Sequence, residues 1–571
     1  MVRPVKRATV LAAVALGAIG CAYVLPMQSV GCAQTAHYAA ERAFASGRPT
    51  IDRWASETCD SVRVGGHVYA AKGPLMDLWA APWYLALRSV GAVPSNPNAG
   101  DRYPAAMTGI PLRAIWQMGL WAVVLPSLLL LVLVRRTVER YEPGLGTACA
   151  AILGLGTLLL PFSTLLFAHA LAALLLFASF VLLLDGGSGP VRIGAAGILA
   201  GLAVSTDVPL AVPATVLGVY AAARSPHLRR LVSFGAGGVI GLIPLLAFDW
   251  WAFGSPFHLP YSGQPGQGAA GGWAQEGFFG LGTPNPRMAV ELFLSQRGLF
   301  VLTPVTVAGV AGIVLLWRRG LRAEAALIGA MSVAVVLWDS GRLHYDFALG
   351  GWVPGPRFLI PLLPFLCFAL APVLRRAPAT VGVLSLVSVG AMAVATAAEP
   401  LIGNDDTRSW FTRLAHGNFA ATVLSLAGIG HGWLAILPFF AFVLVGAGAA
   451  IAATPPLPVG RRDLLVAATA LVAWILIEHG APELLRVDRA VHKDWGVAAA
   501  ILLVAALVWT VFRVRADGLW AALPAVPLLA FATVRFDEHT KWALLVALLV
   551  LLALALVRPL AGRVRRPGIP A

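Results

Sequence analysis

The feature that most constrains the fold is the recurrence of apolar runs close to twenty residues long. Segments such as 120–134 and 542–557 consist mainly of Leu, Val, Ala and Trp. The hydrocarbon core of a bilayer is about 30 Å thick and takes about 20 helical residues to cross. The chain is 58% hydrophobic and only 12% charged, a composition that excludes an ordinary soluble domain. We therefore predict an all-α polytopic membrane protein.

Sixteen segments have the composition of a membrane span. They lie near 8–27, 112–134, 144–162, 165–184, 192–207, 209–223, 231–250, 298–316, 322–338, 357–374, 378–397, 433–452, 464–479, 496–512, 518–533 and 541–557. No convincing small-x-small cleavage site follows the first segment, so we interpret it as a retained helix and not as a signal peptide.

The net charge of +15 is explained by membrane topology. If the N-terminus is cytoplasmic, the short inner segments are strongly basic, and they include "RR" at 135–136, "RSPHLRR" at 224–230, "WRRGLR" at 317–322, "LRR" at 374–376 and "GRRD" at 460–463. Lys and Arg in short cytoplasmic loops fix the orientation of spans. We predict a multi-pass protein of a bacterial plasma membrane with both termini in the cytoplasm, and no nucleic-acid partner.

The outer loops are long where the inner loops are short. They run over 28–111, 251–297, 339–356 and 399–432, and long ordered loops in compact proteins are usually functional. The predicted organisation is a transmembrane core over 1–398, an outer loop over 399–432 and a C-terminal transmembrane bundle over 433–571. The active site is expected on the periplasmic or extracellular side.

The first outer loop, 28–111, contains two amphipathic stretches. "AQTAHYAAERAFASG" and "GPLMDLWAAPWYLALRSVG" have helical spacing and are expected to lie on the membrane surface. Residues 67–72 are expected on the turn between them. Cys32 and Cys59 fall in this loop, where either a disulfide or two free cysteines fit the sequence.

"DSVRVGGHVYAAKGPL" at 60–75 concentrates polar groups beside the first span. Asp60, or as second choice Asp52, can act as a general base toward a sugar or lipid hydroxyl. Lys72 suits a phosphate, and His67 and Tyr69 can hydrogen-bond the same ligand. The structural alternative for each residue is a solvated loop.

Two further stretches carry candidate binding residues. Arg357 stands where "GGWVPGPRFLIPLLPFL" enters a helix, and a buried Arg needs a partner such as a phosphate. The alternatives are that it reaches the surface or pairs with Asp339 or Asp346. Tyr261 in "FGSPFHLPY" and Arg297 in "SQRGLFVLTPV" are candidate cleft residues, with an interfacial aromatic belt as the alternative for the aromatic groups.

Lone polar residues also stand near outer helix ends, namely Asp207, Asp249 and His169. Each fits either a cavity or a helix cap. The sequence has no metal-ligand spacing, no glycine-rich phosphate loop and no nucleophile elbow. An ATP-driven pump is therefore not expected, and no cofactor is predicted, although a divalent cation is left open.

The order of these motifs resembles the GT-C-fold glycosyltransferases, which take a sugar from a polyprenyl phosphate. In the protein mannosyltransferase and lipid A aminoarabinose transferase branch, the first helix precedes a pattern like Asp-Glu-x-x-Tyr and then "Y..KPPL". This chain has Gln34, Thr35 and Tyr38 at the first pattern and "YAAKGPL" at the second. Gln34 therefore occupies the position of the family's catalytic acid. Gln34 and Tyr38 are included in the predicted substrate cleft.

A second group of bacterial membrane proteins, described as glycosyltransferases, is also similar to this chain. The shared stretches are "GRPTID", "ETCDSVRVGGHVYAAKGPL", "FGSPFHLPY", "RGLFVLTPV" and "GGWVPGPRFLIPLLPFL", which reach to about residue 375. The resemblance implies a GT-C-like fold of about sixteen spans, a phosphate-binding role for Lys72, and an acid displaced to Asp60 or Asp52.

The resulting hypothesis is an inverting sugar transferase. It would move a sugar from a polyprenyl-phosphate donor to a cell-envelope glycan, lipid or protein, in contact with membrane lipids. One alternative is a transporter or flippase of a lipid-linked sugar, which would move substrate without forming a product. The other is a non-catalytic partner protein that has lost its acid, with Gln34 as the trace.

Overall fold

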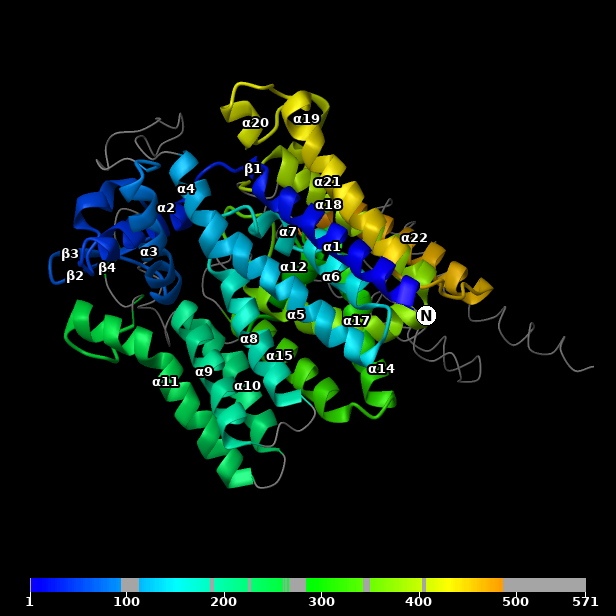
Figure 1. The fold of residues 1–571 in the computed structure, drawn as a ribbon, viewed down its shortest axis with the longest axis horizontal. Helices are drawn as coiled ribbons and strands as arrows, with labels where there is room; N and C mark the ends of the chain where they lie inside the picture. The colour runs from blue at the N-terminus through cyan, green and yellow to red at the C-terminus, as the bar shows by residue number, and fades with distance from the viewer. Residues whose placement is uncertain are drawn as a thin grey trace, which may run out of the picture.

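The computed structural model describes residues 2–93, 112–184, 189–223, 227–259, 261, 264–265, 284–341, 350–402 and 407–485. Helices dominate this part of the chain, and short strands occur in its loops (Figure 1). The predicted spans at 496–512, 518–533 and 541–557 lie outside the described residues, so the count of sixteen stays a prediction.

Long apolar helices make up the body of the protein. Seven described stretches are long and apolar enough to cross a membrane, or eight if one helix pair bent by 96° forms a single span. The seven are Arg7–Val24 within α1, Leu112–Tyr141 (α4, η2 and α5), His227–Phe253 (α11), Arg322–Ser340 (α15), Arg357–Arg376 (η6 and α17), Pro378–Ala398 (α18) and Trp433–Ala453 (α21). The chain is therefore a multi-pass membrane protein.

Other predicted spans are shorter or broken. The bent pair consists of Met288–Leu302 and Val305–Arg318 (α14). The first range contains most of Pro286–Leu294 (α12) and all of Leu299–Leu302 (α13). The shorter apolar helices are Gly146–Leu155 (α6), His169–Leu183 (α8), Pro190–Thr206 (α9) and Val208–Ala222, which includes η4 and α10. The segment 144–162 is interrupted between α6 and Leu159–Phe162 (α7). The helix Arg461–Leu485 (α22) covers the predicted span at 464–479.

Small residues allow close contacts between the helices that carry polar residues at their ends. A Cβ atom on Gly197 or Gly201 of α9 would lie 2.0 or 2.2 Å from backbone oxygens of α11. A Cβ atom on Gly312 of α14 would lie 1.8 Å from the carbonyl oxygen of Ala369 in α17. Glycine lets helix backbones approach in this way within a bilayer. These contacts fix α9 and α17 and therefore the residues at their ends.

The first outer loop folds into a helix, a hairpin and a second helix at one edge of the molecule (Figure 1). The predicted amphipathic helices are present as Cys32–Ala45 (α2) and Leu75–Ser89 (α3). The expected turn at 67–72 is wrong in part. Ser61–Val64 (β2) and His67–Ala70 (β3) pair antiparallel, because Gly65 and Gly66 both adopt positive φ and close a two-residue turn. Gln264–Pro265 (β4) pairs with the other side of β2.

The outer segment after α18 forms a cap near the start of the chain. It contains Arg408–Ala415 (α19), Ala421–Thr422 (β5) and Val423–Leu426 (α20). Strand β5 pairs antiparallel with Pro26–Met27 (β1), directly after α1. Figure 1 shows α19 and α20 together at one end of the molecule.

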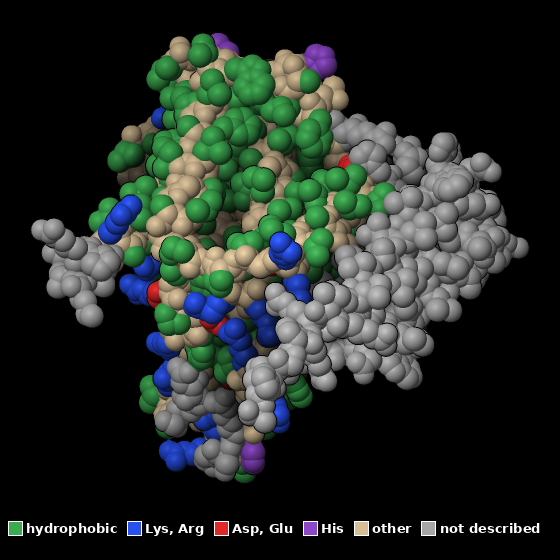
Figure 2. All heavy atoms as spheres, turned by 90° about the vertical axis from the view of Figure 1, so that its right-hand side faces the viewer, with side chains coloured by type: hydrophobic (Ala, Val, Ile, Leu, Met, Phe, Trp, Pro, Cys, Tyr) green, Lys and Arg blue, Asp and Glu red, His purple; other side chains and the backbone are tan. Residues whose placement is uncertain are grey.

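The opposite end is basic. In Figure 2 apolar side chains cover the upper part of one face, and Lys and Arg side chains gather below them. Glu142, at the end of α5, forms ion pairs with Arg319 after α14 and with Arg375 in α17. One carboxylate therefore ties together three helix ends on the basic side.

The structure joins Cys32 and Cys59 by a disulfide, with Cα atoms 5.2 Å apart. Replacing both by Ser should lower the free energy of unfolding by about 2–4 kcal/mol, because the bond restricts the unfolded first loop. Thermal unfolding in detergent should show a lower Tm than for Cys21→Ser, which removes a free cysteine. Alkylation of Cys32 and Cys59 without reductant would contradict the bond.

Candidate functional site

The hairpin brings Asp60 and Lys72 together. Asp60 precedes β2 and Lys72 follows β3, and the N–H of Ala71 donates to the carbonyl of Asp60 at 3.2 Å. The Lys72 ammonium and the Asp60 carboxylate form an ion pair whose side chains are only 14% and 13% exposed. The two residues that the sequence analysis placed first are therefore direct partners.

Gly73 attaches this pair to the transmembrane body. A Cβ atom at Gly73 would lie 2.5 Å from the carbonyl oxygen of Thr206 and 2.9 Å from that of Ser205. These carbonyls end α9, and the next residue is Asp207. Only glycine permits such a backbone approach, and it places Lys72 and Asp207 on the two sides of one contact.

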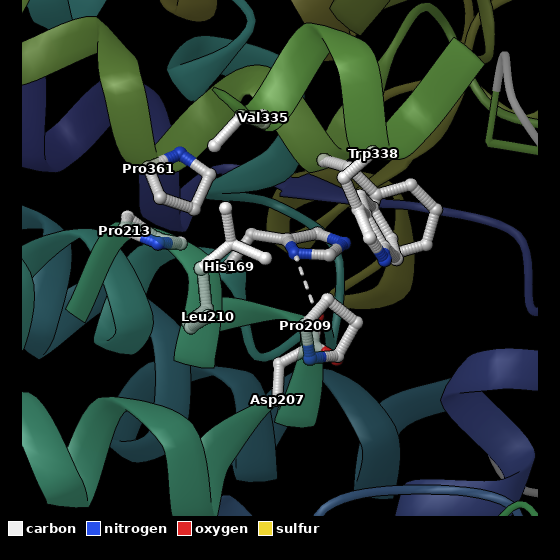
Figure 3. Close-up of a pocket in the computed structure, with 10 residues that line it drawn as sticks. His169, Asp207, Pro209, Leu210, Pro213, Val335, Trp338 and Pro361 are labelled. Carbon is white, nitrogen blue, oxygen red and sulfur yellow. Dashed lines mark ion pairs between the residues drawn. The ribbon is translucent and has the colours of Figure 1, made fainter. Parts of the chain in front are cut away.

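Asp207 lies close to Tyr261 and His169. The Tyr261 hydroxyl donates to Asp207 Oδ1 at 3.3 Å, and His169 Nδ1 lies 3.9 Å from Asp207 Oδ2. Figure 3 shows the His169 and Asp207 side chains pointing toward each other. They line a small pocket of about 10 Å³ whose other walls are apolar, with Trp338 and Phe358 on one side. The sequence marked Asp207 and His169 only as isolated groups.

Arg357 begins η6 (Arg357–Leu362) and lies between aromatic rings. Its guanidinium carbon is 5.2 Å from the ring centre of Phe167 and 5.1 Å from that of Phe358. Its Nε atom is buried and donates no hydrogen bond to a residue within the described ranges. No carboxylate of the described chain forms an ion pair with it, and the predicted alternative partner Asp346 lies outside that part. Arg357 is therefore a cation that no carboxylate of the described chain neutralises by direct contact.

These charges form one cluster. Arg357 is within electrostatic range of Asp60, Asp207 and Tyr261, and His169 is within range of both Arg357 and Lys72. The groups come from the hairpin, the end of α9, the start of α8 and the start of η6. Two cations and two carboxylates from segments far apart in sequence thus meet at one place. Among the described residues, no group of three or more His, Cys, Asp or Glu is arranged to hold a metal ion.

The Arg297 side chain is buried and donates hydrogen bonds to backbone carbonyls. Its Nη1 donates to the carbonyls of Gly351 at 2.5 Å and Val353 at 3.1 Å, and the side chain is 1% exposed. These carbonyls belong to the loop that leads to Arg357. The contacts indicate that Arg297 holds this loop, and its predicted role in a substrate cleft stays a prediction.

Asp52 and His67 form a separate pair at the surface. Their side chains are 42% and 61% exposed, and His67 Nδ1 lies 2.7 Å from Asp52 Oδ2. The other oxygen of Asp52 accepts the N–H of Val68 at 2.6 Å. Partial burial by itself raises the pKa of Asp52, but the hydrogen bonds from Val68 and His67 outweigh burial and lower this pKa. Asp52 therefore fastens η1 (Asp52–Glu57) to the hairpin, and the geometry favours Asp60 as the acid of the cluster.

The remaining predicted residues make well-defined packing contacts. The Tyr69 hydroxyl donates to the carbonyl of Ala252 at 2.9 Å and joins the hairpin to α11. Tyr38 is buried with the Arg42 guanidinium 4.2 Å from its ring centre. Gln34 accepts the N–H of Leu166 at 3.1 Å and donates to the carbonyl of Ser29 at 2.9 Å. Gln34 thus connects α2 to the segment before α8.

Sequence reasoning missed a buried group beneath Lys72. His37 on α2 and Asp77 on α3 are hydrogen-bonded at 2.7 Å. Glu41, one turn after His37, is completely buried, and its carboxylate oxygens have no hydrogen-bond partner in the described chain. The i to i+4 spacing of His37 and Glu41 on an otherwise Ala-rich helix face was the available signal.

No protein-family model and no curated protein matches the chain. A search of solved structures finds ArnT from Cupriavidus metallidurans in the apo state, with 14% identity, a TM-score of 0.42, and coverage of 97% of this chain and 78% of that one. It also finds ArnT from the same organism bound to undecaprenyl phosphate, with 16% identity, a TM-score of 0.41, and coverage of 97% and 88%. The roles of the residues named above follow from the contacts within this chain.

Gly73→Ala tests the junction between the hairpin and α9. The added methyl group would meet the carbonyl oxygen of Thr206 at 2.5 Å, so the loop must move and carry Lys72 away from Asp207. We expect a lower Tm on thermal unfolding in nanodiscs. Gly235→Ala in α11, where a Cβ meets nothing within 4 Å, should not lower the Tm. A Tm for Gly73→Ala equal to that of Gly235→Ala would contradict the junction.

Proposed function

We propose that this chain is a membrane glycosyltransferase that uses a polyprenyl-phosphate-linked sugar at the Asp60, Lys72, Asp207 and Arg357 cluster. The observation that carries the proposal is the environment of Arg357. A guanidinium in contact with two aromatic rings has no carboxylate bound to it in the described chain, and both it and a second cation, Lys72, are within electrostatic range of His169. Paired cations of this kind suit a phosphate, which guanidinium groups bind by two parallel hydrogen bonds.

The location of the cluster supports a lipid-linked phosphate. Arg357 starts an apolar stretch long enough to span a bilayer, and Asp207 ends the apolar helix α9. Lys72 belongs to the hairpin outside these helices. A phosphate held between them would sit at the membrane boundary, with its prenyl chain along apolar helices and its sugar toward the outer loops.

The ion pair between Lys72 and Asp60 supplies a means of activating the base. In the resting state the ammonium is bonded to the carboxylate. When the donor phosphate enters, Lys72 can exchange Asp60 for a phosphate oxygen, and Asp60 is then free to accept a proton. The base would become available only when the donor is in place.

The proposed reaction is a single displacement. The acceptor hydroxyl oxygen attacks the anomeric carbon, the bond from that carbon to the phosphate oxygen breaks, and the hydroxyl proton passes to Asp60. The electron pair of the broken bond stays on the phosphate, where Lys72 and Arg357 stabilise it. One displacement inverts the anomeric carbon. The acceptor is proposed to be an envelope glycan, lipid or protein on the outer face.

The test is a transfer assay on the full chain in nanodiscs, with a panel of radiolabelled polyprenyl-phosphate sugars and a membrane glycan extract. Lys72→Met and Arg357→Met should each reduce labelled product by about 100-fold or more, because each removes a charge that stabilises the leaving phosphate. Arg63→Met is the matched control, since Arg63 is an exposed cation on the same hairpin. Unchanged transfer in both variants would contradict the proposal that Lys72 and Arg357 stabilise the leaving phosphate.

The same assay separates the two acids. Asp60→Asn should reduce transfer by about 100-fold or more, whereas Asp52→Asn should cost less because its oxygens are bonded within the hairpin. Movement of labelled lipid across vesicles without product would favour a transporter. Binding of undecaprenyl phosphate through Lys72, with no product from any sugar, would favour a non-catalytic partner.

A further inference from the structure

The buried pair of His37 and Asp77 lies within electrostatic range of the Lys72 ammonium. His37 Nδ1 and Asp77 Oδ1 are 2.7 Å apart, and the side chains are 3% and 1% exposed. His37 belongs to α2, and Asp77 lies in the first turn of α3. The reaction proposed above uses neither residue, and a buried imidazole and carboxyl in contact are rarely retained for packing alone.

Charged groups of the proposed phosphate site lie within electrostatic range of the pair. The titratable and charged groups within this range of one or the other member are Lys72, Asp60, Asp207, Arg357, His169 and Glu41. The hydrogen bond of His37 to Asp77 uses Nδ1, and Nε2 makes no hydrogen bond to any residue in the described ranges.

Burial favours the uncharged form of both members of the pair. Burial, and after it the Lys72 ammonium, lowers the pKa of His37 to about 3. Burial raises the pKa of Asp77 well above its ordinary range. In the uncharged pair the Asp77 O–H donates to Nδ1 of His37 at the 2.7 Å separation, and the imidazole carries its hydrogen on Nε2.

We propose that His37 and Asp77 act as a proton relay that protonates the leaving phosphate of the lipid donor. This step rests on the proposed function. As the bond between the anomeric carbon and the phosphate breaks, the Nε2 proton passes to a phosphate oxygen and the Asp77 proton passes to Nδ1. The imidazole stays neutral with its hydrogen moved to Nδ1, and Asp77 becomes a carboxylate that accepts this N–H. After the product leaves, the acceptor's proton held on Asp60 passes to Nε2 of His37, and the Nδ1 proton returns to Asp77.

The relay would ease product release. The donor enters as a phosphodiester with one negative charge, and the prenyl phosphate would leave with two. A dianion held by Lys72 and Arg357 in a poorly solvated site would dissociate slowly. The transferred proton returns the phosphate to one charge. The new charge on Asp77 is stabilised by Lys72 and by the N-terminal end of α3.

Asp77→Asn isolates the relay. Its amide N–H still donates to Nδ1 and preserves the ring orientation, but it has no proton to give. We expect kcat to fall by about 100-fold with the donor KM unchanged. In the wild type, kcat should also fall as pH rises through the pKa of Asp77, because the proton is present below that value and lost above it. The variant should lack this alkaline fall. A purely structural role predicts wild-type kcat and an unchanged profile.

A second measurement needs no turnover. Phosphorus NMR of undecaprenyl phosphate bound in nanodiscs reports the pH at which the phosphate becomes a dianion. That pH should be higher in the wild type than in Asp77→Asn, and equal values would overturn the relay. The matched control is Asp249→Asn, which changes a buried carboxyl outside the cluster whose oxygens have no described hydrogen-bond partner, and it should behave as the wild type.

The two measurements separate this proposal from the transferase itself. If the wild type transfers no donor sugar, yet Asp77→Asn shifts the phosphate titration, the proposed sugar transfer is contradicted. The sharing of a proton between Asp77 and the bound phosphate is then still supported. If Lys72→Met abolishes transfer while Asp77→Asn matches the wild type in both rate and titration, the relay alone fails.

Discussion

The contact between Gly73 and the carbonyl of Thr206 is the constraint on which the whole cluster depends. It joins a hairpin outside the apolar helices to the end of α9, and it leaves no room for a side chain. α9 is in turn fixed against α11 by glycines that admit backbone contact. Because both contacts involve backbone, the separation of Lys72 and Asp207 depends little on flexible side chains. This rigidity suits a site that must hold a phosphate at a fixed depth.

The sequence predicts the helical membrane body, the two amphipathic helices of the first loop and the presence of Asp60 and Lys72 together in one stretch. These features are local, since they follow from hydrophobic runs, helical spacing and closeness along the chain. The hairpin was missed although "VRVGGHVY" contains its signal, a Gly-Gly turn between alternating apolar residues. The helical patterns on both sides of this stretch predict only a turn between two helices.

The gathering of Asp207, His169 and Arg357 could not be predicted from one sequence, because it depends on which helix ends meet. The pair of His37 and Asp77 is similar, since 40 residues separate its members and only the packing of α2 on α3 joins them. Gln34 shows the converse. Its type predicts a lost acid, which stays a prediction, and its hydrogen bonds to Leu166 and Ser29 anchor the start of α2.

Charge balance explains why the buried pair beneath Lys72 is kept neutral. If Asp77 were ionised, Lys72 would have two carboxylates as neighbours, Asp60 and Asp77, and an entering phosphate would have to compete with both. With Asp77 protonated, Lys72 has a single anionic partner that it can exchange for the phosphate. Burial thus serves two ends, since it frees the cation for the ligand and stores a proton next to the place where negative charge develops.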